Sequence, residues 1–215
     1  MCDTTTVRGG RDRMGAGGGG GAAGMTVIYL VQHGEKEPLP GDPGLTGAGR
    51  DQALRTARWM RGVGLNAVYS SPQRRARETA EIIASANRVV VHRDVRLRER
   101  MNWDGVRPLA DFMAEWDRST RDRDYVPDGG DSSARAAERL RAFLLDVIAE
   151  PGPVAAATHG GVTVDLLRTL LGDGRLPRRL IAEGVPPCAV TTVHNLEVIE
   201  IASIAHLADD PAERV

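Results

Sequence analysis

The stretch from residue 27 to residue 34 constrains the fold more than any other part of the chain. Residues 27–31 form an apolar run rich in β-branched side chains, which predicts a buried strand. The run ends at Gln32, His33 and Gly34, so His33 is expected at the carboxyl end of a strand, where open α/β sheets bind ligands. Gly34 allows a sharp turn and a close approach to a bound group. A lone histidine at a strand end is often structural, so the rest of the chain must decide its role.

The same pattern occurs again half a chain later. Residues 154–158 form a second buried run, and it too ends in His-Gly, at His159 and Gly160. Further strands are predicted at residues 67–70, 89–91, 189–194 and 197–204, with helices at 47–61, 74–85, 108–118 and 162–171 and from a cap at Ser132 or Ser133 to residue 150. Strands that alternate with helices predict a three-layer α/β/α sandwich with a mostly parallel central sheet. Both histidines would then lie at one edge of that sheet.

A chain of 215 residues suits one domain. We expect one ordered domain at residues 25–206 and a C-terminal tail at 207–215. Residues 98–130 have no clean period and hold half of the aromatic residues, so they predict a small lid-like insertion over the strand C-terminal edge. Those rings either pack the insertion or contact a ligand. Residues 1–24 are rich in glycine and predict a disordered extension, which is either upstream of a natural start at Met25 or a regulatory tail.

The net charge and the composition limit the kinds of partner that we expect for this protein. The net charge of −1 gives no field that would favour nucleic acid or an anionic membrane. No apolar run is long enough for a membrane helix, and no secretory signal follows the N-terminal arginines. Two cysteines far apart in sequence suggest neither a disulfide framework nor a metal knuckle. We therefore expect a cytoplasmic protein without nucleic-acid or membrane partners, and its oligomeric state stays open.

An anion site is the expected use of the two histidines. The turn at residues 70–72 follows a strand, so Arg74, Arg75 and Arg77 should leave the same sheet edge. Guanidinium groups fit phosphate because their planar fork matches two oxygens, and a histidine can carry a phosphoryl group. Zinc binding is the competing interpretation of two histidines, but no clear set of further ligands joins them and the arginines would repel a cation.

Several segments, in order along the chain, resemble the histidine phosphatase superfamily, the phosphoglycerate-mutase-like group. Residues 30–35 resemble its signature segment, residues 70–80 its Ser-Pro-x-x-Arg-Ala segment, and residues 97–100 the segment that holds a proton donor. Leu45, Thr46, Gly49 and Gln52 match the start of the helix that follows the signature, residues 129–132 resemble a Gly-Glu-Ser turn with Asp131 for Glu, and residues 158–161 match the second histidine. The resemblance covers residues 25–200.

The resemblance implies a role for each matching residue. His33 would be the nucleophile, Arg75 and His159 would clamp the phosphoryl oxygens, and Glu99 would donate a proton to the leaving oxygen. Glu99 is otherwise a surface charge among arginines. Neighbouring arginines should lower the pKa of His33 and keep it neutral. The resemblance also implies that Gln32, Gly34, Thr46 and Gly160 bind the substrate and that no metal or organic cofactor is needed.

One position departs from the family pattern, because the family has an arginine where this chain has Gln32. A charged hydrogen bond contributes roughly 1.5–3 kcal/mol, so its loss could weaken the site about ten- to a hundredfold. Lys36 or Arg74 could supply the missing charge. We expect a metal-independent phosphatase that hydrolyses a small phosphomonoester through phosphohistidine. The alternatives are a phospho-ligand binding or regulatory protein, a phosphoglycerate-mutase-type enzyme and a phosphohistidine-protein phosphatase.

Overall fold

One six-stranded sheet organises the part of the chain that the structure, a computed structural model, describes, residues 26–208. The strands are β1 Val27–Gln32, β2 Ala67–Ser70, β3 Val91–Arg93, β4 Val154–Thr158, β5 Val190–His194 and β6 Glu197–Ser203. Their order in the sheet is β3-β2-β4-β1-β5-β6. The four strands from β3 to β1 are parallel, whereas β5 pairs antiparallel with β1 and β6 antiparallel with β5.

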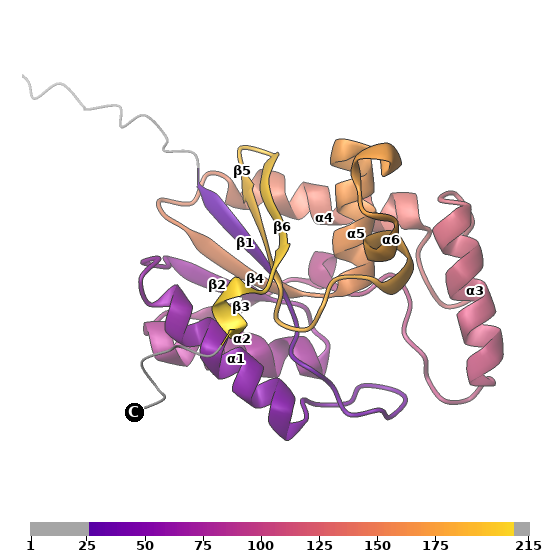
Figure 1. Ribbon diagram of the computed structural model, residues 1–215, viewed down its shortest axis with the longest axis horizontal. Coiled ribbons are helices and arrows are strands. Elements are labelled where there is room, and N and C mark those ends of the chain that lie inside the picture. The colour runs from indigo at the N-terminus through magenta and orange to yellow at the C-terminus, as the bar shows by residue number, and fades with distance from the viewer. Residues whose placement is uncertain (1–25, 209–215) are drawn as a thin grey trace, which may run out of the picture.

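Helices cover both faces of this sheet. The α-helices of the described residues are α1 Gly47–Met60, α2 Arg74–Asn87, α3 Leu109–Arg121, α4 Ser133–Val147, α5 Gly160–Leu171 and α6 Arg178–Glu183. Helices α1 and α2 lie on one face, and α4 and α5 lie on the other (Figure 1). The predicted three-layer α/β/α sandwich with a mostly parallel sheet is therefore confirmed.

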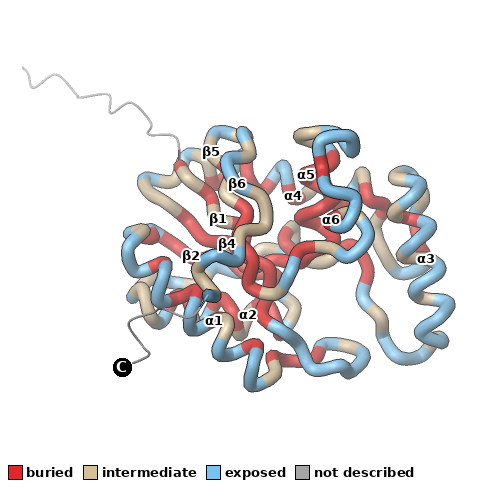
Figure 2. The backbone as a smooth tube through the Cα atoms, in the orientation of Figure 1, coloured by how far each residue is buried: buried red, intermediate tan, exposed pale blue. Residues whose placement is uncertain are grey.

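The side chains of β1 show why this chain forms three layers. Successive residues of a strand point to opposite faces. Leu30 packs in a core cluster with Phe143 of α4 and Leu166 of α5, whereas Val31 packs in a second cluster with Met60 of α1. Figure 2 shows that the central strands β1 and β4 are largely buried, whereas β6 at the sheet edge is not. A strand that is apolar on both faces needs both layers of helices.

All the predicted helices and strands are present, and their boundaries lie within three residues of the sequence prediction. Thr46 caps α1 and Ser132 caps α4, each by accepting a backbone N–H of the first turn. Strand β3 begins two residues later than predicted, because Arg88 ends α2 in the left-handed region (φ 57°) and Val89 still bonds to that helix. The sequence did not predict α6, which is six residues long and contributes Leu180 to a core cluster.

Helix α3 differs from the other long helices. It stands at the edge of the molecule beyond α5 and α6, and Figure 2 shows it largely exposed. Ser119 is its only buried residue. The helix belongs to the insertion predicted at residues 98–130. The predicted N-terminal extension lies outside the described residues, as does the tail beyond residue 208.

Candidate active site

Three parallel strand ends meet where the two histidines lie. His33 follows β1, Ser71 follows β2 and His159 follows β4. Backbone hydrogen bonds hold these ends together, from the N–H of His33 to the carbonyl of Thr158 (3.1 Å) and from that of Ser71 to Ala157 (3.0 Å). The centres of the two imidazole rings are 5.2 Å apart. The structure thus brings together two histidines that are half a chain apart, as the sequence predicted.

The geometry around His33 leaves one ring nitrogen as a nucleophile. Its Nδ1 lies 2.7 Å from the carbonyl oxygen of Gly34, which can only accept, so Nδ1 carries the proton and Nε2 holds a lone pair. The Nε of Arg75 donates to that Nε2 at 3.1 Å. Burial lowers the pKa of His33 to about 3, and the charges of Arg75 and Lys36 act in the same direction. His33 is therefore neutral at pH 7. The arginine effect predicted from sequence is present, but burial is the larger cause.

His159 lies deeper than His33. It is fully buried, and its Nε2 is 2.8 Å from the hydroxyl oxygen of Ser71. Burial lowers its pKa well below the ordinary value, and the charge of Arg75 acts in the same direction. A second neutral imidazole therefore lies beneath the first. Its predicted role as a clamp for phosphoryl oxygens stays a prediction.

Glu99 is held at the N-terminus of α5. Its carboxylate oxygens accept the backbone N–H groups of Gly161 (2.9 Å) and Val162 (2.8 Å). The sequence assigned no role to Gly161 beyond its place in the motif at residues 158–161, yet a Cβ there would lie 2.5 Å from Trp116 and 2.7 Å from the Glu99 carboxylate. Arg139, also missed, donates to the backbone carbonyls of residues 96, 98 and 99 and so braces the segment that carries Glu99. Glu99 is thus a built part of the site and not a loose surface charge.

A cavity of about 320 Å³ lies above His33. Its polar wall consists of Gln32, His33, Lys36, Arg75, Glu99 and Asn102. The apolar part of the lining includes Leu39, Trp103, Leu109, Phe112 and Trp116. Three of the aromatic side chains of the insertion therefore line the cavity, so they do more than pack the insertion.

Of the two cationic residues that could compensate for Gln32, only Lys36 lines the cavity. Lys36, the only lysine in the chain, lines the cavity, and no carboxylate among residues 26–208 forms an ion pair with it. The guanidinium of Arg74 instead donates to the carboxylate of Glu78 at 2.7 Å. Neither Arg74 nor Arg77 lines the cavity. Of the three arginines expected at this edge, only Arg75 reaches His33.

Three residues predicted to bind substrate have structural roles in the fold. Thr46 does not line the cavity, and its hydroxyl caps α1 by accepting the N–H of Gly49 at 2.9 Å. A Cβ on Gly34 would collide with the backbone of Gly49, so the close approach that requires this glycine is to α1. Gly160 starts α5 without lining the cavity, and a Cβ there would lie 3.0 Å from the backbone N of Val185. Their substrate-binding roles stay predictions, and these positions do not favour them.

Unpaired polar atoms cluster around His33. Gln32 Oε1, Arg75 Nη1 and His159 Nδ1 are buried without a hydrogen-bond partner among the described residues. Buried polar groups in folded proteins are almost always paired, so a group of unpaired ones marks a place that a polar ligand completes. Two of the three atoms can donate, which suits the oxygens of a phosphoryl group.

The comparisons with known proteins agree with this geometry. A family model described as histidine phosphatase superfamily (branch 1) matches residues 28–196. The chain therefore belongs to the histidine phosphatase superfamily. It is 33% identical to a probable phosphoglycerate mutase GpmB from Proteus mirabilis over 218 residues, which cover 89% of this chain and 99% of that protein. Phosphoryl transfer through a histidine is thereby supported.

Solved structures include phosphatases as well. A mycobacterial glucosyl-3-phosphoglycerate phosphatase in complex with inorganic phosphate is 25% identical, with a TM-score of 0.68 over 84% of this chain and 99% of that one. Bacillus stearothermophilus YhfR is 27% identical, with a TM-score of 0.66 over 85% of this chain and 99% of that one. Both phosphatase and mutase names thus occur among the similar proteins.

Two features are absent from residues 26–208. No three side chains of histidine, cysteine, aspartate or glutamate converge there as ligands of one metal ion. In the same part of the chain, no helix combines the length and the apolar character needed to span a bilayer.

Proposed function

We propose that this protein is a metal-independent phosphatase that hydrolyses a small phosphomonoester through a phosphohistidine intermediate. The observation that carries the proposal is the cluster of unpaired buried polar atoms around the neutral imidazole of His33. A nucleophilic lone pair and unsatisfied donors at one point are what in-line attack on a phosphoryl group requires.

The proposed reaction consists of two half-reactions. In the first, Nε2 of His33 attacks phosphorus, the P–N bond forms and the P–O bond to the alcohol breaks, while Glu99 gives its proton to the leaving oxygen. In the second, water attacks phosphorus and gives a proton to Glu99, and the P–N bond breaks to release phosphate. The N–H of Arg75 now occupies the lone pair of His33, so substrate must draw it away onto a phosphoryl oxygen. The same contact keeps Arg75 beside the reacting atom.

The charge distribution of the cavity favours a phosphatase over a mutase. A mutase must retain and reorient a bisphosphorylated intermediate, so it needs cationic groups for a second phosphate. The two cationic residues that line this cavity, Arg75 and Lys36, both act electrostatically on His33. The remaining wall is largely apolar, which offers no site for a second dianion.

The test measures phosphate release from ethyl phosphate, benzyl phosphate and 3-phosphoglycerate in EDTA, with wild type and His33→Ala. We expect release by the wild type, none by His33→Ala, and an acid-labile phosphoenzyme in the wild type only. A parallel assay follows conversion of 3- to 2-phosphoglycerate after priming with the bisphosphate. Conversion faster than hydrolysis would replace the phosphatase with a mutase.

A second candidate function rests on Gln32. This buried side chain lies beside the nucleophile, with its Nε2 3.4 Å from Nε2 of His33, and brings no charge to the site. A site with reduced charge can bind a phospho-ligand without turning it over. Binding of inorganic phosphate or vanadate without any hydrolysis of the esters would support a binding or regulatory protein.

A further inference from the structure

One face of α3 forms the apolar wall of the cavity. Leu109, Phe112 and Trp116 stand at positions i, i+3 and i+7, which lie on the same side of a helix. All three line the cavity above His33, while the rest of α3 is mostly exposed. A helix with one buried residue is not using this face to build a core. The apolar stripe is instead directed at the cavity.

Two loops complete the apolar wall. Trp103 comes from the loop before α3, and Leu39 from the loop after β1. The loops are tied together, since the N–H of Gly41 donates to the carbonyl of Trp103 at 2.8 Å. Leu39 is 59% exposed and Leu109 is 50% exposed, although both line the cavity. Apolar side chains that stay exposed at the rim of a cavity mark a binding surface.

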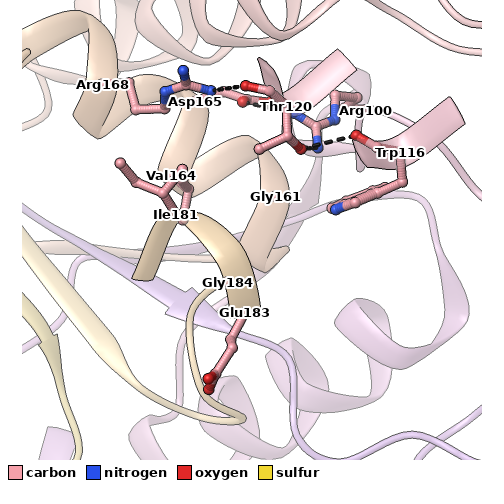
Figure 3. Close-up of a pocket in the computed structure, with 10 residues that line it drawn as sticks. All are labelled: Arg100, Trp116, Thr120, Gly161, Val164, Asp165, Arg168, Ile181, Glu183 and Gly184. Carbon is pink, nitrogen blue, oxygen red and sulfur yellow. Dashed lines mark hydrogen bonds and ion pairs between the residues drawn. The ribbon is translucent and has the colours of Figure 1, made fainter. Parts of the chain in front are cut away.

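Buried charged side chains pack against Trp116 and hold it in place. The guanidinium of Arg100, 3% exposed, lies 4.1 Å from the centre of the Trp116 ring. Arg100 pairs with Asp165 of α5 at 2.9 Å and donates to the hydroxyl of Thr120 at 2.9 Å. Figure 3 shows Arg100 between Trp116 and Thr120, with Arg168 on the far side of Thr120. Two helices therefore hold the indole in place.

The position of Trp116 relates the apolar wall to the chemistry. A Cβ on Gly161 would touch both the edge of the Trp116 ring and the carboxylate of Glu99, so the two groups meet at one point. Glu99 is the proposed donor to the leaving oxygen, so the alcohol part of the ester must lie beside it. That alcohol therefore contacts Trp116 and the wall that Phe112 and Leu109 extend.

We propose that the substrate is a monoester whose alcohol carries a flat aromatic group and no second anionic group. This inference rests on the proposed phosphatase function and specifies its substrate class. A phosphoryl group would face His33, Arg75 and Lys36, and the ring would pack against Trp116 and Phe112. A cavity of about 320 Å³ is at the small end of ligand sites, which suits one or two fused rings. Arg107 lies over the Phe112 ring, with its guanidinium 5.5 Å from the ring centre, but it does not line the cavity. A carboxylate or a second phosphate placed on this wall would therefore lose hydration without a cation in the lining beside it.

The experiment compares esters that differ in the ring. Benzyl phosphate and ethyl phosphate are both esters of primary alcohols, so the comparison measures mainly recognition of the ring. We expect kcat/KM for benzyl phosphate to exceed that for ethyl phosphate roughly 10- to 100-fold, as burial of a phenyl ring implies. 3-Phosphoglycerate should be a poorer substrate than benzyl phosphate. A ratio near one, or a preference for 3-phosphoglycerate, would overturn the inference and leave the phosphatase function intact.

Two tryptophan variants test the wall itself. Trp116→Leu should lower the benzyl-to-ethyl ratio several-fold. Trp59→Leu is the matched control, because Trp59 of α1 packs against Tyr29 and His206, outside the cavity, and should leave the ratio unchanged. A ratio that survives Trp116→Leu, or that falls equally in both variants, would contradict the assigned wall.

Ligand binding separates this inference from the proposed function. Benzylphosphonate and methylphosphonate cannot be hydrolysed, and their dissociation constants are measured by calorimetry with the wild type. Tighter binding of benzylphosphonate without turnover of any ester would refute the phosphatase but support the ligand class. Equal affinity for the two phosphonates would overturn the ligand class whatever the turnover.

Discussion

The two strand ends that carry His33 and His159 have nearly the same local sequence, yet they place their histidines differently. His33 is 8% exposed and lines the cavity, whereas His159 is fully buried and lies against Ser71. After β4 the chain enters α5 at once, at Gly160, so the helix covers His159. After β1 a loop of more than ten residues precedes α1 and leaves His33 open to the cavity. The segment after a strand therefore decides whether the histidine at the strand end meets a ligand.

Loss of His33, the proposed nucleophile, should have the largest effect on turnover. We expect His33→Ala to lower kcat for benzyl phosphate at least about 10⁴-fold, because the covalent route is then closed. No acid-labile phosphoenzyme should form, while the melting temperature changes little. Phosphoenzyme that persists in this variant would transfer the nucleophile to another residue, with His159 the first candidate.

Glu99 contacts the β4 end through the α5 N-terminus and acts at the β1 end, so it connects the two. Glu99→Gln should lower kcat about 10²- to 10⁴-fold for benzyl phosphate, whose leaving group needs a proton. The loss should be much smaller for 4-nitrophenyl phosphate, whose leaving group departs without one. Equal losses for both esters, measured at the same pH, would show that Glu99 only supports the structure.

Replacement of the buried His159 tests how its role differs from that of His33. His159→Ala should lower kcat about 10²- to 10³-fold through lost transition-state contacts, but it should still form phosphoenzyme. The variant should also lose about 2 kcal/mol of unfolding free energy, because it opens a cavity and leaves Ser71 without its partner. Urea unfolding beside His33→Ala provides the contrast. A His159 variant as stable as that control would contradict its structural role.

The residues that precede the two histidines also differ, since Gln32 faces the cavity and Thr158 is fully buried. Gln32→Arg adds a charged donor next to His33 and should raise kcat/KM about tenfold or more. Gln32→Met, of similar size but without a donor, is the control and should show no gain. A fall in kcat/KM for Gln32→Arg would indicate that Lys36 already supplies the charge.

The smallest expected effect is the pH dependence of the free energy of unfolding, which tests whether His33 is buried as a neutral imidazole. Its pKa is about 3 in the folded protein and near 6.5 in the unfolded chain, so between these values the unfolded state binds more protons. Stability due to His33 is therefore complete above pH 6.5 and falls as the pH is lowered, by about 2 kcal/mol at pH 5.

The measurement is the difference in unfolding free energy between wild type and His33→Ala at pH 7.5 and pH 5. Asp165, whose pKa is raised to about 6 by burial, contributes with the opposite sign, but it is present in both proteins and cancels in the difference. A difference that does not change with pH would mean that His33 is not buried as a neutral base.

Much of the fold could be predicted because its signals are local. The caps at Thr46 and Ser132 and the apolar periods of the strands depend on neighbouring residues, and these elements are confirmed. Helix α6 was missed because six residues between two proline-containing segments carry too short a period to recognise. The start of β3 was missed because a left-handed Arg88 ends α2 late.

The site was predicted less completely, for a related reason. The two histidines and Arg75 were found because each follows a strand of one parallel sheet. The requirement for a glycine at position 161 was missed because it is imposed by the Trp116 ring and the Glu99 carboxylate, which come from distant parts of the chain. The i, i+3, i+7 spacing of Leu109, Phe112 and Trp116 was a usable signal, but spacing alone does not say what the stripe faces.

By itself the sequence determined the layers of this protein and the strand ends that meet, and the family pattern led to His33 as the proposed nucleophile. These depend on apolar period and chain direction, which every strand and helix carries within itself. The tertiary structure alone decided that His159 is covered while His33 is open, that Lys36 rather than Arg74 lines the cavity, and that the Trp116 ring lies beside the Glu99 carboxylate. Those outcomes depend on contacts between segments far apart in the chain, and no local pattern encodes such contacts.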